Sequence, residues 1–266
     1  MSFNINLINI RKNIIKMIYS SGSGHPGSSL SLVEILSVIC FEQVDWNSKK
    51  RDRLILSKGH GVPALYSIFY ELNLINTDDI NSFRRLNSKL QGHPDRTKLN
   101  LIDAGTGALG QGISISIGYS LGMRMSGNIS KNVYCVIGDG EIQEGQIWES
   151  AMFAAANKIS NLCVFVDLNE MQNEREVEKT LPLGDLGKKW ESFGWQVLHI
   201  DGHNMEEIRS AISEFKLMKD RPTIIIAKTI KGKGVSFMEA NPEWHGKKID
   251  EISFLAAMKE LSNESN

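Results

Sequence analysis

Two apolar segments of the sequence each end in a turn that carries oxygen-bearing side chains. Residues 133–137 lead into Gly138-Asp139-Gly140-Glu141, and residues 162–166 lead into Asp167-Leu168-Asn169. Short apolar runs bounded by glycine and aspartate are typical of strands buried on both faces of a parallel sheet, and such sheets bind ligands beyond the carboxyl ends of their strands. We therefore expect Asp139 and Asn169 to be neighbours in space, at a site for a metal-bound diphosphate.

The residue types at this site suit a hard divalent cation. Mg²⁺ prefers oxygen ligands in near-octahedral geometry and usually keeps phosphate oxygens in its coordination shell. Asp139 offers a carboxylate, Asn169 a neutral amide oxygen, and Met171 a main-chain carbonyl just beyond it. Gly138 and Gly140 allow the backbone to approach the phosphates closely. A Gly-Asp-Gly tripeptide by itself is equally typical of an ordinary strand-to-helix turn, so the prediction depends on the second strand ending in Asn169.

Histidines are the other residues whose setting could support chemistry. Four of the six lie next to glycine in predicted loops: His25, His60, His93 and His245. A single loop histidine is usually solvated, but histidine titrates near neutrality, and loops at one end of a rigid sheet can bring several together. Such a group suits a reaction that moves protons on and off hydroxyl and carbonyl oxygens. His199, inside a predicted strand, and His203, in Asp201-Gly202-His203-Asn204, are expected to have structural roles, His203 in shaping a turn.

An alternation of strands and helices must position these segments. Apolar runs predict strands at residues 53–57, 133–137, 162–166, 195–200 and 223–228. Apolar periodicity predicts helices at residues 4–20, 32–41, 65–74, 79–86, 113–125, 148–157, 186–193 and 204–217. Residues 21–29 are expected to break the first helix, and residues 259–266 to fray. This series predicts an α/β fold, with a doubly wound, mainly parallel sheet covered by helices on both faces, in a single domain over residues 1–266.

Bulk composition excludes several classes of protein. Of the 266 residues, 41% are hydrophobic and 23% charged, which is typical of a globular chain with a full core. The formal net charge of -1 gives no basic surface for nucleic acid, and no segment is predicted to cross a membrane or to act as a leader, so we expect a cytoplasmic protein. Cys40, Cys135 and Cys163 lie in apolar runs and are expected to be buried core residues.

The string from Gly138 to Glu149, Gly-Asp-Gly-Glu-Ile-Gln-Glu-Gly-Gln-Ile-Trp-Glu, resembles transketolase among the thiamine diphosphate enzymes. The resemblance implies the family fold of a diphosphate-type thiamine diphosphate domain, with Mg²⁺, or alternatively Ca²⁺ or Mn²⁺, bound by Asp139, Asn169 and the main-chain carbonyl of Met171. Glu144 and Glu149 match acidic residues that lie near the dimer interface in the family and link its two active sites.

Further segments are similar to transketolase and extend the resemblance from about residue 21 to 246. They contain the four glycine-flanked histidines, the run Gly105–Gly112, and the run Lys231–Val235, which as a bare sequence would pass for a solvated basic turn. The resemblance implies catalytic roles for His25, His60, His245 and Glu144. It also implies cofactor contacts from His60, His93, Gly107, Ala108, Leu109, Gly138, Asp139, Gly140, Glu141, Asn169, Met171 and His245.

The chain departs from the family pattern after Asn169, where Glu170-Met171-Gln172-Asn173 lacks the usual Asp-Gly pair, and at Ala108. A larger departure is length, because transketolases also have a pyrimidine-type domain, which carries the glutamate that activates the cofactor, and a C-terminal domain. We therefore expect a C-terminal partner subunit on a separate chain, two such pairs forming a dimer of heterodimers, and sugar phosphate substrates for two-carbon ketol transfer. Two alternatives remain open: a related enzyme, such as a deoxyxylulose phosphate synthase or an unusual-sugar transketolase, and a non-catalytic cofactor-binding regulatory chain.

Overall fold

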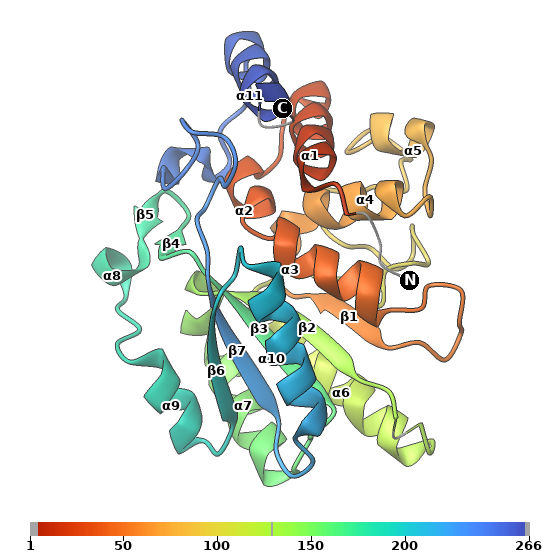
Figure 1. Cartoon of the computed structure of the whole chain (residues 1–266), viewed down its shortest axis with the longest axis vertical. Helices are drawn as coiled ribbons and strands as arrows, with labels where there is room; N and C mark the ends of the chain where they lie inside the picture. Colours follow the sequence, from red (N-terminus) through yellow and green to blue (C-terminus); the bar gives the residue numbers. More distant parts are fainter. Residues whose placement is uncertain (1–4, 129, 264–266) are drawn as a thin grey trace.

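The computed structural model describes residues 5–128 and 130–263, with a parallel five-stranded sheet at its centre (Figure 1). The sheet order is β1-β2-β3-β7-β6. The strands are β1 (Arg53–Leu56), β2 (Val133–Gly138), β3 (Leu162–Leu168), β6 (Gln196–Asp201) and β7 (Thr223–Lys228). The expected α/β fold with a doubly wound parallel sheet is confirmed. All five predicted strands are present with small shifts at their ends.

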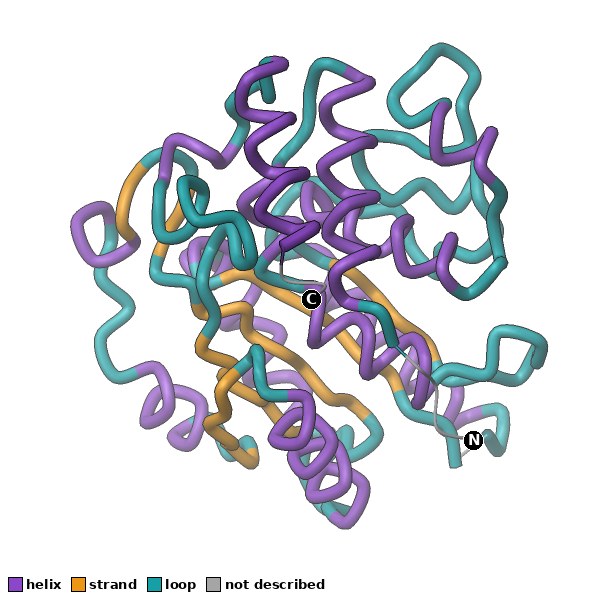
Figure 2. The backbone as a smooth tube through the Cα atoms, turned by 45° about the horizontal axis from the view of Figure 1, so that its top comes forward, coloured by secondary structure: helices purple, strands orange, loops and turns teal. Residues whose placement is uncertain are grey.

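Helices cover both faces of this sheet (Figure 2). Alternate strand residues point to opposite faces. Tyr134 and Phe165 therefore join one buried cluster, and Cys135 and Val164 join the other. The first cluster lies under α1 (Leu7–Ser21), α3 (Val33–Val38), α4 (Val62–Glu71), α10 (Met205–Leu217) and α11 (Glu251–Asn263), and the second under α6 (Gln111–Met125), α7 (Gly145–Ala156) and α9 (Leu186–Ser192).

Short elements connect these layers. They are α2 (Pro26–Leu30), α5 (Thr77–Asn81), α8 (Val177–Thr180), the small hairpin β4 (Met171–Gln172) and β5 (Arg175–Glu176), a π-helical turn at Ile39–Gln43, and single 3₁₀ turns at Gly59–Gly61, Gly140–Gln143 and Pro242–His245. The helix starts follow local capping rules. The Asn204 side chain, for example, accepts hydrogen bonds from the backbone N–H groups of Glu206 and Glu207 at the start of α10.

The helix predicted at residues 79–86 is wrong beyond Asn81, where α5 ends. Arg84 and Asn87 have positive φ angles of 60° and 64°, which a continuing helix does not allow. The Arg84 N–H instead donates to the Leu90 carbonyl at 2.9 Å. The chain therefore folds back on itself. Helical periodicity does not predict this contact between Arg84 and Leu90.

The predicted break of the first helix is confirmed, because α1 ends at Ser21 with Gly22 in a left-handed C-cap. A short separate helix, α2, then begins at Pro26, whose fixed φ suits a first helical position. The expected fraying fails for residues 259–263, because α11 continues to Asn263 and buries Ala257 and Leu261 against the core. The remainder of that predicted tail, residues 264–266, lies outside the described residues.

The three cysteines are free and buried, as predicted. Across residues 5–128 and 130–263, no helix has the length and apolar character needed to cross a membrane.

Candidate active site

The carboxyl ends of four neighbouring strands converge on one region. Lys58 and His60 follow β1, Asp139 follows β2, Asn169 follows β3, and Lys231 follows β7. This is the edge at which parallel α/β sheets bind ligands. The prediction that Asp139 and Asn169 are neighbours is confirmed, because the N–H of Glu170, the residue after Asn169, donates to Asp139 Oδ2.

A cavity of about 300 Å³ lies over these strand ends. It brings together most of the residues singled out from the sequence. Its lining includes the four glycine-flanked histidines and Gly107, Leu109, Gly138, Asp139, Gly140, Glu141, Glu144, Asn169 and Met171, together with Ser28, Lys58, Gln143, Gln172 and Asn173. Ala108 instead lines an adjoining hollow with His93 and Gly107.

Asp139 is a buried carboxylate that forms no ion pair with another described residue. It is only 2% exposed, and its Oδ1 accepts a hydrogen bond from the Gly140 N–H at 2.8 Å. Burial, followed by the like charge of Asp167, raises the pKa of Asp139 to about 7. A bound cation would relieve this cost, since it stabilises the ionised form.

Asn169 is oriented by its own neighbours. Its Nδ2 donates to Asp167 at 3.1 Å, and its Oδ1 accepts from the Met171 N–H at 3.2 Å. No group of three or more His, Cys, Asp or Glu side chains within the described ranges forms a metal site. The expected ligand set differs from such a group, since it combines one carboxylate, one amide oxygen and one main-chain carbonyl.

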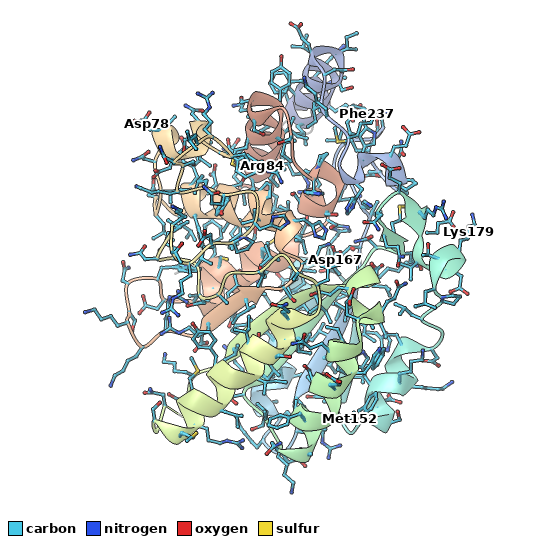
Figure 3. All side chains as sticks on the ribbon, turned by 180° about the vertical axis from the view of Figure 1, so that it is seen from behind. Asp78, Arg84, Met152, Asp167, Lys179 and Phe237 are labelled. Atoms are coloured by element: carbon cyan, nitrogen blue, oxygen red, sulfur yellow. The ribbon has the colours of Figure 1, made fainter. Side chains whose placement is uncertain are left out.

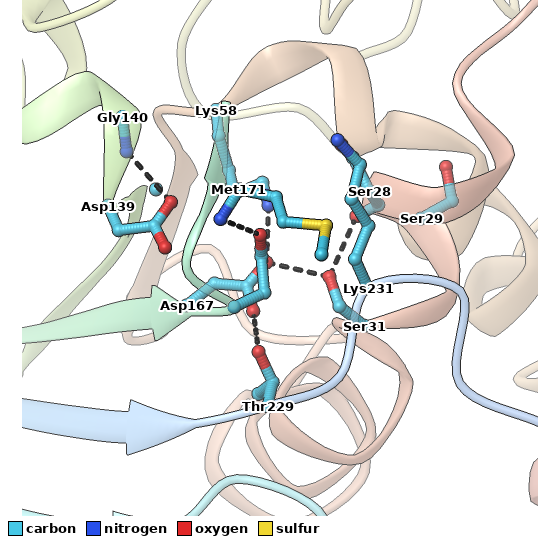
Figure 4. A network of polar contacts seen from close by, with 12 residues as sticks. Ser28, Ser29, Ser31, Lys58, Asp139, Gly140, Asp167, Met171, Thr229 and Lys231 are labelled. Carbon is cyan, nitrogen blue, oxygen red and sulfur yellow. Dashed lines mark hydrogen bonds and ion pairs between the residues drawn. The ribbon is translucent and has the colours of Figure 1, made fainter. Parts of the chain in front are cut away.

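Asp167 organises the floor of the cavity (Figure 4). Its carboxylate is fully buried and accepts hydrogen bonds from Ser31 (2.7 Å), Lys58, Thr229 and Asn169. Burial by itself would raise the pKa of Asp167, but the Lys58 charge and these hydrogen bonds outweigh it and hold the pKa below its usual value. Asp167 is therefore ionised, and its hydrogen bonds connect the segments that follow β1, α2 and β7 to β3.

Three histidine rings form a close triangle. The ring centroids of His25, His60 and His245 are separated by 5.1 to 5.2 Å, and His93 lies 6.3 Å from His25. Burial, followed by the Arg84 charge, lowers the pKa of His25 to about 4, and burial, followed by the Lys231 charge, lowers that of His245 to about 3. Burial also lowers the pKa of His60 and of His93. All four are neutral at pH 7, so each ring can donate from one nitrogen and accept at the other.

Lys231 is not among the site residues predicted from the sequence. The run Lys231–Val235 is not simply a solvated basic turn, because Lys231 is only 1% exposed. Its Nζ donates to the Asn173 carbonyl at 3.0 Å and lies 3.4 Å from His245 Nδ1, both at the cavity wall. It forms no ion pair with a carboxylate among the residues that the structure describes. Burial, followed by the charge of Lys58, lowers the pKa of Lys231 to about 8.

The predicted acidic residues have different surroundings. Glu141 Oε1 accepts from the Ser57 hydroxyl and from the Gly110 N–H, and Oε2 accepts from the Gly138 N–H at 3.0 Å. The carboxylate of Glu141 thus joins three loops of the chain itself. Glu144 and Glu149 are exposed, at the start and on the outer surface of α7.

The cavity suits a diphosphate cofactor with its metal. His25 Nδ1 and Gln172 Oε1 are buried and have no hydrogen-bond partner in the described part of the chain, which is unusual outside a ligand site. Lys231 supplies a buried positive charge for an anion, and Asp139 with Asn169 supplies oxygen ligands for a cation. At Gly140, an added Cβ would lie 2.6 Å from Gln172 Cβ, so the backbone there approaches the cavity wall closely.

Comparison with known proteins agrees with this geometry. A family described as transketolase, thiamine diphosphate binding domain, matches residues 4–264. The 6-deoxy-6-sulfo-D-fructose transketolase subunit SqwG of Clostridium sp. (strain MSTE9) is 40% identical over 260 residues, which cover 96% of this chain and 94% of that protein. An apulose-4-phosphate transketolase subunit from Actinobacillus succinogenes is 36% identical over 263 residues, covering 96% and 93% respectively.

A solved structure also matches. The crystal structure of transketolase from Campylobacter jejuni superposes with a TM-score of 0.86 at 30% identity, over 98% of this chain and 43% of the other. The chain therefore belongs to the transketolase family and corresponds to its thiamine diphosphate binding domain.

Proposed function

We propose that the chain is the N-terminal subunit of a split transketolase and holds thiamine diphosphate through Mg²⁺ at Asp139, Asn169 and the Met171 carbonyl. One observation carries the proposal: a buried carboxylate with a raised pKa lines the cavity, and a buried lysine that forms no ion pair with a described carboxylate contacts the lining residues Asn173 and His245. A diphosphate with its metal satisfies both, since the metal neutralises the carboxylate and the phosphate oxygens accept from the lysine. Ca²⁺ and Mn²⁺ are the alternative cations.

The histidines define what this chain contributes to ketol transfer. Thiamine diphosphate, when bound, supplies the carbanion chemistry. The triangle of His25, His60 and His245 supplies neutral rings that can hold the carbonyl and hydroxyl groups of a sugar and exchange protons with them. His93 contacts Gly107, where an added Cβ would lie 3.3 Å from the ring, so it borders the part of the cavity assigned to the cofactor.

The outer surface of α6 and α7 is the proposed docking face for the partner subunit. Met152 and Phe153 on α7 are 54% and 49% exposed. Met152 is labelled at the surface in Figure 3. On α6, Gly118 and Gly122 have open space beside them, which allows another backbone to approach closely. An exposed apolar surface of this kind is typical of an interface. Glu144 lines both the cavity and this side of the molecule, so a partner docked here would complete the active site.

The nature of the partner follows from the relatives of equal length. Two of them are named as subunits, and each is matched over more than nine tenths of its length. We propose that the chain is one diphosphate-type domain and that its partner carries the pyrimidine-type and C-terminal domains, including the carboxylate that activates the cofactor. Two such pairs would form a dimer of heterodimers.

Reconstitution tests this function. The chain is purified alone and together with the product of a neighbouring gene for a pyrimidine-type domain. Thiamine diphosphate binding is measured by calorimetry with Mg²⁺, and ketol transfer is measured from a ketose phosphate to an aldose phosphate. We expect activity only from the pair. Full activity of the chain alone would reject the split arrangement, and cofactor binding without any transfer would support the regulatory alternative.

A ketose donor with a different terminal group is a second candidate substrate for the same ketol transfer. The two subunit relatives are named for different sugars, a sulfonated deoxyfructose and apulose 4-phosphate. A panel of phosphorylated and sulfonated ketoses, with several aldehyde acceptors, distinguishes these substrates from ordinary ketose phosphates. Formation of deoxyxylulose phosphate from pyruvate would instead support the synthase alternative.

A further inference from the structure

The end of β6, the fifth strand, leads to His203, which is not among the cavity-lining residues named above. His203 Nε2 accepts a hydrogen bond from the Ile230 N–H at 2.8 Å, and its Nδ1 lies 2.9 Å from Glu34 Oε2. A backbone N–H can only donate, so Nε2 is the acceptor and Nδ1 carries the proton that Glu34 accepts. The sequence reading of His203 as a turn residue is therefore incomplete, because its ring fixes the residue directly before Lys231.

The same chain of contacts continues to the other side of Lys231. Arg11 Nη2 donates to Glu34 Oε1 at 2.6 Å, and Arg11 Nε donates to the Lys233 carbonyl at 3.0 Å. Glu34 is thus shared between His203 and Arg11, and these two side chains hold the loop on either side of Lys231. Arg11 and Glu34 are 6% and 4% exposed. A buried polar network is costly unless every member has a hydrogen-bond partner. Arg11, Glu34 and His203 each have one.

We propose that Arg11, Glu34 and His203 are positioning residues that hold the 230–233 backbone so that the Lys231 ammonium stays against the cavity. Their side chains do not line the cavity, and they lie on α1, α3 and the β6–α10 connection, on the same side of the sheet (Figure 1). The proposal rests on the proposed function, because that function pairs Lys231 with the diphosphate.

The glycines of this loop agree with a fixed backbone. Gly232 has a φ of 83°, and an added Cβ would lie 2.2 Å from the Met238 carbonyl oxygen. Gly234 has a φ of 90°, and an added Cβ would lie 2.7 Å from Arg11. The Gly232 N–H also donates to the Gly27 carbonyl at 3.0 Å, next to Ser28 in the cavity wall. The loop is therefore packed against Met238, Arg11 and Gly27, and the Lys231 Nζ lies against His245 and Asn173.

A double-mutant cycle on thiamine diphosphate affinity tests the proposal in the complex with the partner subunit. The variants are His203→Leu, Lys231→Ala and the pair of substitutions together. We expect His203→Leu to weaken binding about tenfold, the cost of losing one well-placed hydrogen-bonded contact. In the Lys231→Ala background the same substitution should have no further effect on affinity, since the ammonium that it positions is absent.

Additional variants separate positioning from folding. His203→Gln retains an acceptor for the Ile230 N–H and should restore most of the affinity, while His199→Gln, on the exposed edge of β6, should leave it unchanged. If His203→Leu does not fold, Arg11→Met replaces it in the cycle, because it breaks the contact to Lys233 from the other end. Thermal unfolding is recorded for every variant.

The outcomes are distinct. Equal losses of affinity from His203→Leu in both backgrounds would overturn the positioning role, because a merely structural effect is independent of Lys231. Unchanged affinity in Lys231→Ala would also overturn it, while the proposed function would stand on wild-type binding. Absence of thiamine diphosphate binding by the wild-type complex would overturn both.

Discussion

Lys58 and Asp167 form a buried ion pair that passes beneath the end of β2. Lys58 follows β1, Asp167 lies in β3, and their side chains are 3% and 0% exposed. The pair therefore connects two strands that are not adjacent in the sheet, and Lys58 also lines the cavity. It also compensates part of the negative charge that Asp139 and Asp167 place close together.

Removing one partner of this pair should be strongly destabilising. Asp167→Asn removes the ion-pair partner of the buried Lys58 ammonium, and we expect the free energy of unfolding to fall by about 3–5 kcal/mol. Urea denaturation followed by circular dichroism measures the loss. Asp220→Asn is the matched control, because Asp220 pairs with Arg221 on the surface, where ion pairs contribute little. A loss in Asp167→Asn no larger than in the control would contradict the assigned role.

The histidine triangle should make stability depend on pH. In the unfolded chain a histidine has a pKa near 6.5, whereas in the folded protein the values are about 4 for His25 and about 3 for His245. Between these values the unfolded state binds protons that the folded state does not, so these groups lower stability as the pH falls from about 6.5. The double variant His25→Gln, His245→Gln should lose less stability than wild type between pH 7 and pH 5.

Urea midpoints at the two pH values give this comparison. Asp139 acts in the opposite direction, because its pKa is raised to about 7, but it is present in both proteins and its contribution cancels. Identical pH dependence in wild type and the double variant would show that the two rings do not titrate as described.

Asp139→Ala should abolish Mg²⁺-dependent cofactor binding. We expect the affinity for thiamine diphosphate to fall by about a hundredfold or more, since even indirect perturbation of metal ligands costs about 10- to 100-fold. In wild type, affinity should also decrease below pH 7, because the ligand must lose its proton before it binds metal. Calorimetry with Mg²⁺, Ca²⁺ or Mn²⁺ measures both effects, with the exposed Asp220→Ala as control. Unchanged binding in Asp139→Ala would reject the metal assignment.

The docking face on α7 should be sensitive to charge. Replacing Met152 and Phe153 with aspartate places two charges at the centre of the proposed interface and should weaken association with the partner subunit by at least about tenfold. Analytical ultracentrifugation of the mixed subunits measures this. Leu217→Asp is the control, because Leu217 is 79% exposed but belongs to α10, on the opposite face of the sheet. Equal effects of the two changes would place the partner elsewhere.

The sequence predicts the sheet and the proximity of Asp139 and Asn169 for a physical reason. Strands buried on both faces must be apolar throughout, so runs such as 162–166 stand out, and parallel strands bring their carboxyl ends to one edge. Asp139 and Asn169 could therefore be placed together without a structure. The turn at Arg84 could not, because its φ of 60° depends on a contact with Leu90 rather than on local preference.

The sequence by itself determined the order of βα units, the family motif around Asp139 and the set of glycine-flanked histidines, because these depend on local periodicity and residue type. Only the tertiary structure decided that Lys231 is buried at the cavity wall, that Glu141 binds loops of its own chain, and that His203 holds the Ile230 backbone. Each of these depends on contacts between segments far apart in the chain, which set burial and hydrogen bonding independently of the local sequence.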